Sequence, residues 1–399
     1  MNLPPPPAPQ HDDPIITQFK PVQDQWELND DSIKLIDPET GNTILHNYCK
    51  CINTTPVEVY RYLIETKGCD VNAQDKSKDT LLHWAVRYFN PNKGGEINVL
   101  TYLINQKNVN VNIKGKSGNT LLHTACQRIN DLPLDIFKVL IETHGFDVNA
   151  QNDFKMTSLR IALYHFDPHL GGITVLMYLL SRKDVNVNIN SGYNNTLLHE
   201  ACQRINKLPL DVFKFLIGTR GCDMNVRNNN KNTPLHNALL LFDQNKGGEI
   251  NVLTYLLSQK GVNANIKGDN GYSLLHLASQ KINKFPLEIF KLLIETHGAD
   301  LDTQDGDKNT PIHSALDYFN PNDGGDINVL VYLINQKNID LNTKYKRDYT
   351  LLHTTCMINL SNLWYPAQLN AEYDTILSQI VEVIVERCIE EVLDEINLK

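Results

Sequence analysis

The sequence of residues 120–151, TLLHTACQRINDLPLDIFKVLIETHGFDVNAQ, decides the fold because variants of it recur along most of the chain. The tetrapeptide TLLH, or a variant such as TILH, TSLR, TPLH, SLLH or TPIH, opens nine segments. Successive segments begin 37, 40, 37, 39, 37, 40, 37 and 40 residues apart. A recurring period of this size is typical of repeat architectures. The segments begin at Thr43, Thr80, Thr120, Thr157, Thr196, Thr233, Ser273, Thr310 and Thr350.

The segments alternate between two types, so the true period is a pair of about 77 residues, 37 plus 40. Short repeats resemble residues 120–151, and long repeats resemble residues 80–115, TLLHWAVRYFNPNKGGEINVLTYLINQKNVNVNIKG. The stretch NKGGEINVLTYL occurs at 92–103 and again, unchanged, at 245–256. Duplication of whole pairs explains this identity most simply.

Each repeat is predicted to contain two helices. The opening threonine is a good N-cap, since its hydroxyl can accept a bond from a free amide of the first turn. Pro234 and Pro311 then occupy the first helical position, where a missing N–H costs nothing. The second helix is amphipathic, with Leu134, Phe137, Leu140 and Ile141 on its apolar face. In the short repeats it is expected to end at a glycine that tolerates the left-handed turn: Gly68, Gly145, Gly221 or Gly298.

The TPLH box, the apolar second helix, the helix-ending glycine and the following DVNA together resemble the ankyrin repeat. The resemblance implies an all-α repeat solenoid of about nine helix-turn-helix pairs with projecting hairpins. The family's unit has about 33 residues, and these repeats are longer. The extra residues lie mainly between the two helices, with one more at the helix end. We expect the added loops to lie together along one edge of the array.

Three parts are predicted along the chain. Residues 1–26 contain PPPPAP and many acids and predict a disordered tail. Residues 27–360 form the repeat array. Residues 361–399 are predicted to be a capping segment, with an amphipathic helix over 371–397 that covers the last repeat. Alternatively, Pro4–Pro7 could bind an SH3-like or WW-like groove, and the C-terminal helix could dock a partner helix. A solvated tail and self-capping are favoured.

Charge and composition exclude several classes of protein. The net charge of −9 arises at the ends: residues 1–40 and 372–399 each carry −6, which leaves +3 for the 331 residues between them. A nearly neutral centre argues against nucleic-acid binding. No apolar run approaches 18 residues, so no membrane span is expected. Eight cysteines without a visible signal peptide fit a reducing compartment, and we expect a cytoplasmic protein.

The residues that could carry chemistry follow the repeat, which favours structural roles. A histidine in every repeat cannot be one catalytic base, and regular spacing keeps these side chains from converging on a metal. We expect them to tie neighbouring hairpins and threonines together. The cysteines three residues later fit a small-residue position between helices, and the GG pairs fit turns. No enzyme, metal or cofactor is therefore predicted. The histidines are His46, His83, His123, His199, His236, His276, His313 and His353.

Arg160 stands where the fourth repeat should have its histidine. The replacement could mark a weak joint or a local binding feature. Sequence drift is the favoured interpretation.

The resemblance implies that partners contact the concave face, built from hairpin tips and the exposed side of the first helices. Matching positions by their distance from each threonine gives alternating basic residues and aromatics, which dominate protein-binding hot spots. The predicted protein-binding residues are Arg87, Tyr88, Arg128, Tyr164, His165, Tyr193, Arg204, Leu241, Tyr272, Lys281 and Tyr318.

The sequence thus predicts a non-enzymatic, monomeric scaffold or adaptor that binds a protein partner. The alternative is an effector or host-range factor of an intracellular bacterium or virus, which would act on a host protein in the host cytoplasm. The richness in Asn, Ile and Lys hints at an AT-rich genome and motivates this alternative.

Overall fold

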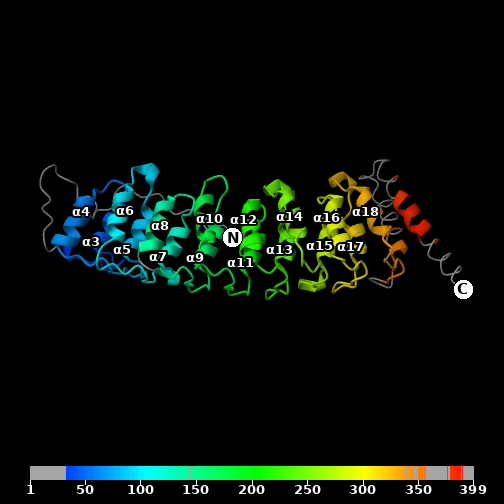
Figure 1. Cartoon of the computed structure of the whole chain (residues 1–399), viewed down its shortest axis with the longest axis horizontal. Coiled ribbons are helices and arrows are strands. Elements are labelled where there is room, and N and C mark those ends of the chain that lie inside the picture. The colour runs from blue at the N-terminus through cyan, green and yellow to red at the C-terminus, as the bar shows by residue number, and fades with distance from the viewer. Residues whose placement is uncertain are drawn as a thin grey trace. The chain divides into compact units, whose positions relative to one another are not determined.

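The computed structural model describes residues 33–143, 146–337, 339–344, 349–353, 355, 375, 378–387 and 389. Two compact halves divide the chain, Met1–Val185 and Asn186–Lys399. Within each half, the odd-numbered helices form one row and the even-numbered helices a second row, and the turns between repeats project from the first row (Figure 1). This is an all-α repeat solenoid, as predicted.

The described part of the N-terminal half contains four helix pairs. Helix α3 packs against α5, and α7 packs against α9, so first helices contact first helices of the next repeat. The first helices are α3 (Ile44–Lys50), α5 (Leu81–Tyr88), α7 (Leu121–Cys126) and α9 (Ser158–His165). The second helices are α4 (Val57–Arg61), α6 (Ile97–Ile104), α8 (Leu134–Thr143) and α10 (Ile173–Ser181).

The described part of the C-terminal half repeats this arrangement, with α11 against α13 and α15 against α17. The first helices are α11 (Leu197–Gln203), α13 (Pro234–Leu241), α15 (Leu274–Gln280) and α17 (Pro311–Tyr318). The second helices are α12 (Leu210–Lys214), α14 (Ile250–Leu257), α16 (Leu287–Lys291) and α18 (Ile327–Ile334).

A threonine or serine immediately precedes each first helix, as predicted, and has the extended backbone of an N-cap. The Thr120 hydroxyl accepts a bond from the amide of His123, and Ser273 caps His276 in the same way. The apolar face also matches the prediction, since Phe137, Leu140 and Ile141 are buried, although Leu134 is only half-buried.

In three of the short repeats, a turn of π-helix continues the second helix and accommodates the extra residue at its end. This wider turn absorbs one residue without breaking the helix. Gly68, Gly221 and Gly298 follow it with φ of +69°, +63° and +58°, as the glycine prediction required. Gly145 lies outside the described residues. The π-helical turns span Tyr62–Thr66, Phe215–Thr219 and Leu292–Thr296.

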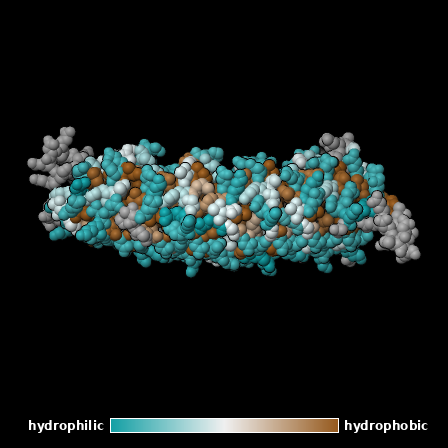
Figure 2. Space-filling view, viewed as in Figure 1, coloured by the Kyte–Doolittle hydropathy of each residue, from teal (hydrophilic) through white to brown (hydrophobic). Residues whose placement is uncertain are grey.

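The predicted hairpins are shorter than two-stranded ribbons. Single antiparallel bridges join Gln74 with Thr80 and Gln151 with Thr157, and no described segment forms a longer strand. The connections are tight turns with left-handed residues at their tips: one in some turns, such as Lys78 or Lys231, and two adjacent ones in others, such as Ser117 and Gly118. Figure 2 shows a largely hydrophilic surface in this view, since most apolar side chains fill the helix contacts.

The predicted N-terminal tail lies outside the described residues, as does most of the C-terminal segment. Residues 378–387 of that segment are helical. Ile380 and Ile384, one turn apart, are fully buried, whereas Val385 and Ile389 are exposed. One side of this helix is thus buried and another leaves apolar side chains exposed, and its role as a cap stays a prediction.

Candidate functional site

The repeat histidines form the first of two recurring joints between repeats. In the joint at His236, the Thr233 amide donates to Nδ1 at 3.2 Å, and Nε2 lies 3.1 Å from the Tyr272 carbonyl oxygen. Since Nδ1 accepts, Nε2 carries the proton and donates. We call this arrangement the histidine joint. The pairs of histidine and accepting carbonyl are His46 and Asp79, His83 and Asn119, His123 and Met156, His199 and Asn232, His236 and Tyr272, and His276 and Asn309.

Burial keeps these imidazoles neutral. It lowers the pKa of His236 and of His313 to about 4, because the charged form would lose its hydration. The pKa values of His46, His83, His123 and His276 are lowered for the same reason. A buried, neutral side chain with both nitrogens bonded is suited to holding the fold. This confirms the predicted tie between turns and threonines.

A second joint, on the side of the inter-helix loops, was missed by the sequence reasoning. Asn206 donates through Nδ2 to the Leu241 carbonyl at 2.8 Å and accepts from the Asp243 amide at 2.9 Å. Its side chain thus bridges one loop to the loop of the next repeat. The signal in the sequence was the dipeptide Ile-Asn, which ends the motifs CIN, RIN, RIN and KIN in the four successive short repeats. The asparagines of this asparagine joint are Asn53, Asn130, Asn206 and Asn283.

The GG pairs lie in turns, as predicted, and the asparagine joint explains why glycine is needed there. A Cβ atom at Gly248 would lie 2.6 Å from Asn206 Oδ1 and 2.8 Å from the Asp243 carbonyl oxygen. Gly95 and Gly325 are equally close to Asn53 and Asn283. The loops of neighbouring repeats therefore lie side by side within each half, along one edge.

The buried cysteine position also matches its prediction. Cys49, Cys126 and Cys202 are fully buried, as is Ser279 at the equivalent place. Burial raises the pKa of each of these thiols, because a thiolate there would be unhydrated. They are packing residues, since a reactive cysteine needs a stabilised thiolate. Cys356 lies outside the described residues.

The side chains of two predicted binding residues form hydrogen bonds within the array. Arg128 donates through Nη1 to the carbonyls of Arg87 and Phe89, at the end of α5. The Lys281 ammonium donates to the carbonyls of Leu240 and Phe242 at the end of α13, at 2.6 and 2.8 Å. Both cations cap the preceding first helix, where free carbonyls and the helix dipole favour positive charge. Both side chains are thus engaged within the array, and their role in partner binding stays a prediction.

Three further residues from the predicted set are also partly enclosed. Arg87 forms an ion pair with the buried Asp79 at 2.7 Å. The ring of Tyr272 lies against His276 and is half-buried, and Arg204 is half-buried as well. Arg160 is almost completely buried, with 1% of its side chain exposed, which removes it from any binding surface.

The remaining predicted residues are exposed, and most occupy one place in the repeat. Tyr88, Tyr164, His165, Leu241 and Tyr318 lie in the last two positions of the first helices of long repeats, and Tyr164 is 62% exposed. We call these residues, together with Leu240, the aromatic-apolar row. Tyr193, 76% exposed, lies in a turn between repeats.

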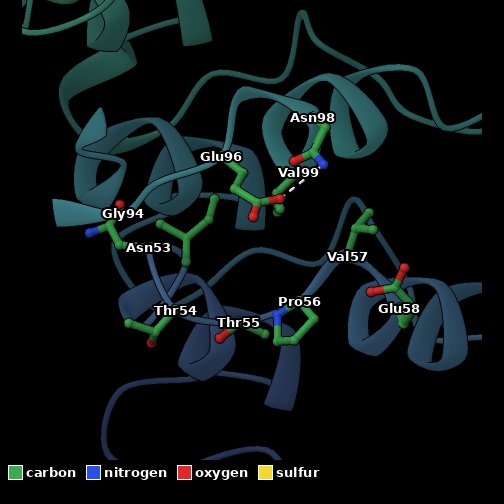
Figure 3. Close-up of a pocket in the computed structure, with 11 residues that line it drawn as sticks. Asn53, Thr54, Thr55, Pro56, Val57, Glu58, Gly94, Glu96, Asn98 and Val99 are labelled. Carbon is green, nitrogen blue, oxygen red and sulfur yellow. Dashed lines mark hydrogen bonds between the residues drawn. The ribbon is translucent and has the colours of Figure 1, made fainter. Parts of the chain in front are cut away.

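A cavity of about 240 Å³ lies between the first two inter-helix loops. Residues 52–58 form one wall, and Gly94, Glu96, Asn98 and Val99 form the other. Figure 3 shows Glu96 among these residues, above Thr54, Thr55 and Pro56, with Glu58 beyond Val57. No group of three or more His, Cys, Asp or Glu residues suited to a metal ion occurs in the part of the chain that the structure describes.

Comparison with known proteins agrees with this geometry. Overlapping matches to the family model for ankyrin repeats extend from residue 22 to residue 345. The chain belongs to the ankyrin-repeat family. This family is generally non-catalytic, and its repeats form a protein-interaction module. Among the described residues, no helix is long and apolar enough to cross a bilayer.

Two curated relatives share part of the ankyrin array. Alpha-latrocrustotoxin-Lt1a of Latrodectus tredecimguttatus is 28% identical over 261 residues, which cover 64% of this chain and 17% of the toxin. A probable serine/threonine-protein kinase of Dictyostelium discoideum is 28% identical over 121 residues, which cover 29% of this chain and 13% of the kinase. The chain therefore spans less than a fifth of either relative.

Proposed function

We propose that this ankyrin protein is a binding scaffold whose partner contacts the aromatic-apolar row within one half, at the ends of α5 and α9 or at the ends of α13 and α17. One observation carries the proposal: each long repeat exposes a tyrosine or leucine in the last two positions of its first helix, where the short repeats carry Lys or Gln followed by Cys, Arg or Lys. An exposed tyrosine offers a large contact area and loses little rotamer freedom on binding. Exposed apolar groups that recur at one position indicate selection for contact rather than for stability.

The internal hydrogen bonds of two basic residues limit the kind of partner that fits this proposal. Arg128 and Lys281 cap helices and offer little free charge to a partner. The surface that remains is aromatic and apolar, with Tyr88 and Tyr164 in the N-terminal half and Leu241 and Tyr318 in the C-terminal half. A partner segment with apolar side chains fits this surface better than an acidic one.

The test is a crosslinked pull-down from cell lysate, read by mass spectrometry. One variant carries Tyr88→Ala and Tyr164→Ala, and a second carries Leu241→Ala and Tyr318→Ala. The matched control carries Gln127→Ala and Gln203→Ala, at exposed polar positions near the ends of short-repeat first helices. Circular dichroism confirms that each variant is folded.

We expect at least one protein to be captured by wild type and by the control but lost with one of the two tyrosine variants. A partner set that is the same for all four proteins would contradict the proposal. The effector alternative stays a prediction, since the toxin match covers only a small part of the toxin.

A further inference from the structure

One residue that lines the cavity between the first two inter-helix loops is smaller than its counterparts in the repeat. Thr55 stands where the other short repeats carry the buried side chains of Leu132, Leu208 and Phe285. The cavity beside it has a volume of about 240 Å³. An engineered cavity of about 150 Å³ is large enough to bind benzene. The space is therefore sufficient for a side chain.

The side chains that line this cavity offer more hydrogen-bond acceptors than donors. The hydroxyls of Thr54 and Thr55 both donate to the Cys51 carbonyl, at 3.2 and 2.9 Å. Asn53 Nδ2 donates to the Tyr88 carbonyl, and Asn98 Nδ2 donates to Glu96, which leaves each amide one further N–H. Carboxylate oxygens and hydroxyl lone pairs make up most of the rest, so a ligand rich in donors fits this lining.

Two exposed carboxylates line this cavity. Glu58 lies in the first turn of α4, and Glu96 is the N-cap of α6, positions where the helix dipole favours an anion. In two other short repeats the equivalent acids, Asp135 and Asp211, pair with a lysine three residues later. At this place Arg61 lies over the ring of Tyr102 instead. None of the residues that line the cavity is basic.

The two joints of the C-terminal half carry a lysine at this position. Thr54 corresponds to Lys207 and Lys284 there, and to Asp131 in the other short repeat of the N-terminal half. The loops of the C-terminal half thus have a lysine and a larger apolar residue, Leu208 or Phe285, where the first joint has two threonines. The first joint has neither the cation nor the large apolar residue.

We propose that this cavity binds the side chain of a lysine or arginine from a protein partner. The ammonium or guanidinium group donates to Glu58 and Glu96, and the aliphatic stem lies over Pro56 and Val57. This site is on the loop edge of the first two repeats and is separate from the aromatic-apolar row, so the two proposals can fail independently.

The experiment is an NMR titration of the full-length ¹⁵N-labelled chain with N-acetyl-lysine-methylamide and N-acetyl-arginine-methylamide. N-acetyl-norleucine-methylamide is the uncharged probe of similar size, and MgCl₂ tests for a simple cation site. We expect saturable shifts of the Thr54, Thr55, Gly94 and Gly95 amides with a basic probe and none with norleucine.

Three variants test the assignment. Thr55→Leu places the residue of the later joints into the cavity and should abolish the shifts, and Thr54→Lys should do the same by supplying an internal ammonium. Glu96→Gln should weaken binding about tenfold, because one charge-assisted bond is lost. The matched control, Glu249→Gln, changes the equivalent acid of a later joint and should leave binding unchanged.

The proposal is overturned if no basic probe gives saturable shifts, or if norleucine or magnesium gives the same shifts. It is also overturned if binding survives Thr55→Leu in a folded chain. Should Thr55→Leu fail to fold, the pair Glu96→Gln and Glu249→Gln decides the question.

Discussion

The two edges of the array connect neighbouring repeats by different chemistry. On the edge of the turns, buried histidines such as His236 link a threonine to a carbonyl 36 residues further on. On the edge of the inter-helix loops, half-exposed asparagines such as Asn206 link a carbonyl and an amide of the next loop. Both side chains bridge two repeats with two hydrogen bonds. Only the imidazole titrates, so the two edges should respond differently to acid.

The largest expected effect is that of pH on the histidine edge. The folded pKa of His236 and His313 is about 4, below the unfolded value of about 6.5. Between these values the unfolded chain binds more protons, so stability is complete above pH 6.5 and falls as the pH drops toward 4. By pH 5 each of the two histidines should cost about 2 kcal/mol of the free energy of unfolding.

The measurement is urea denaturation at pH 7.5 and pH 5.0, followed by circular dichroism. The urea midpoint should be clearly lower at pH 5.0, and the other lowered histidines should add to the loss. An unchanged midpoint would show that the folded chain does not keep the imidazoles of the histidine joints in their neutral form.

Removing one histidine should have a smaller effect. His236→Ala leaves the buried Thr233 amide and the Tyr272 carbonyl without a partner and opens a small cavity. A loss of about 3 kcal/mol is expected at pH 7.5. The same urea series measures it, with the exposed His165→Ala as control, for which less than about 0.5 kcal/mol is expected. The variant should also lose less stability than wild type between pH 7.5 and 5.0, since one titrating group is gone.

The smallest effect is expected on the asparagine edge. Asn206→Ala removes two hydrogen bonds at a half-exposed site where water can replace them, so a loss of about 1–2 kcal/mol is expected. This loss should be the same at pH 7.5 and pH 5.0, because an amide does not titrate. A pH-dependent loss, or one as large as that of His236→Ala, would remove the distinction between the two edges.

The sequence predicted those features that depend on one repeat or on its period. The threonine caps, the helix-ending glycines and the small cysteine position were correct because local backbone geometry or the repeat itself restricts them. The histidine joint was also predictable, since a titratable residue in every repeat cannot be a unique catalyst. These arguments do not require knowing which surfaces of neighbouring repeats pack against each other.

The candidate site was predicted less well. Arg128 and Lys281 were assigned to a binding surface because their type suits recognition, yet they cap helices some 40 residues earlier in the chain. The side chains at the ends of the long-repeat helices were correctly expected to be exposed. The difference is reach: the long side chain of a cation can turn back onto the neighbouring repeat, whereas the ring of Tyr164 stays exposed at the end of its helix.

The sequence by itself determined the repeat, the two helix types and the residues that begin and end each helix, because these follow from period, capping and turn chemistry. Only the tertiary structure decided how the repeats fit together. It showed the asparagine joint, the burial of Arg160 and the cavity beside Thr55. Each depends on contacts between residues far apart in the chain, whose register is fixed by the packing of neighbouring repeats.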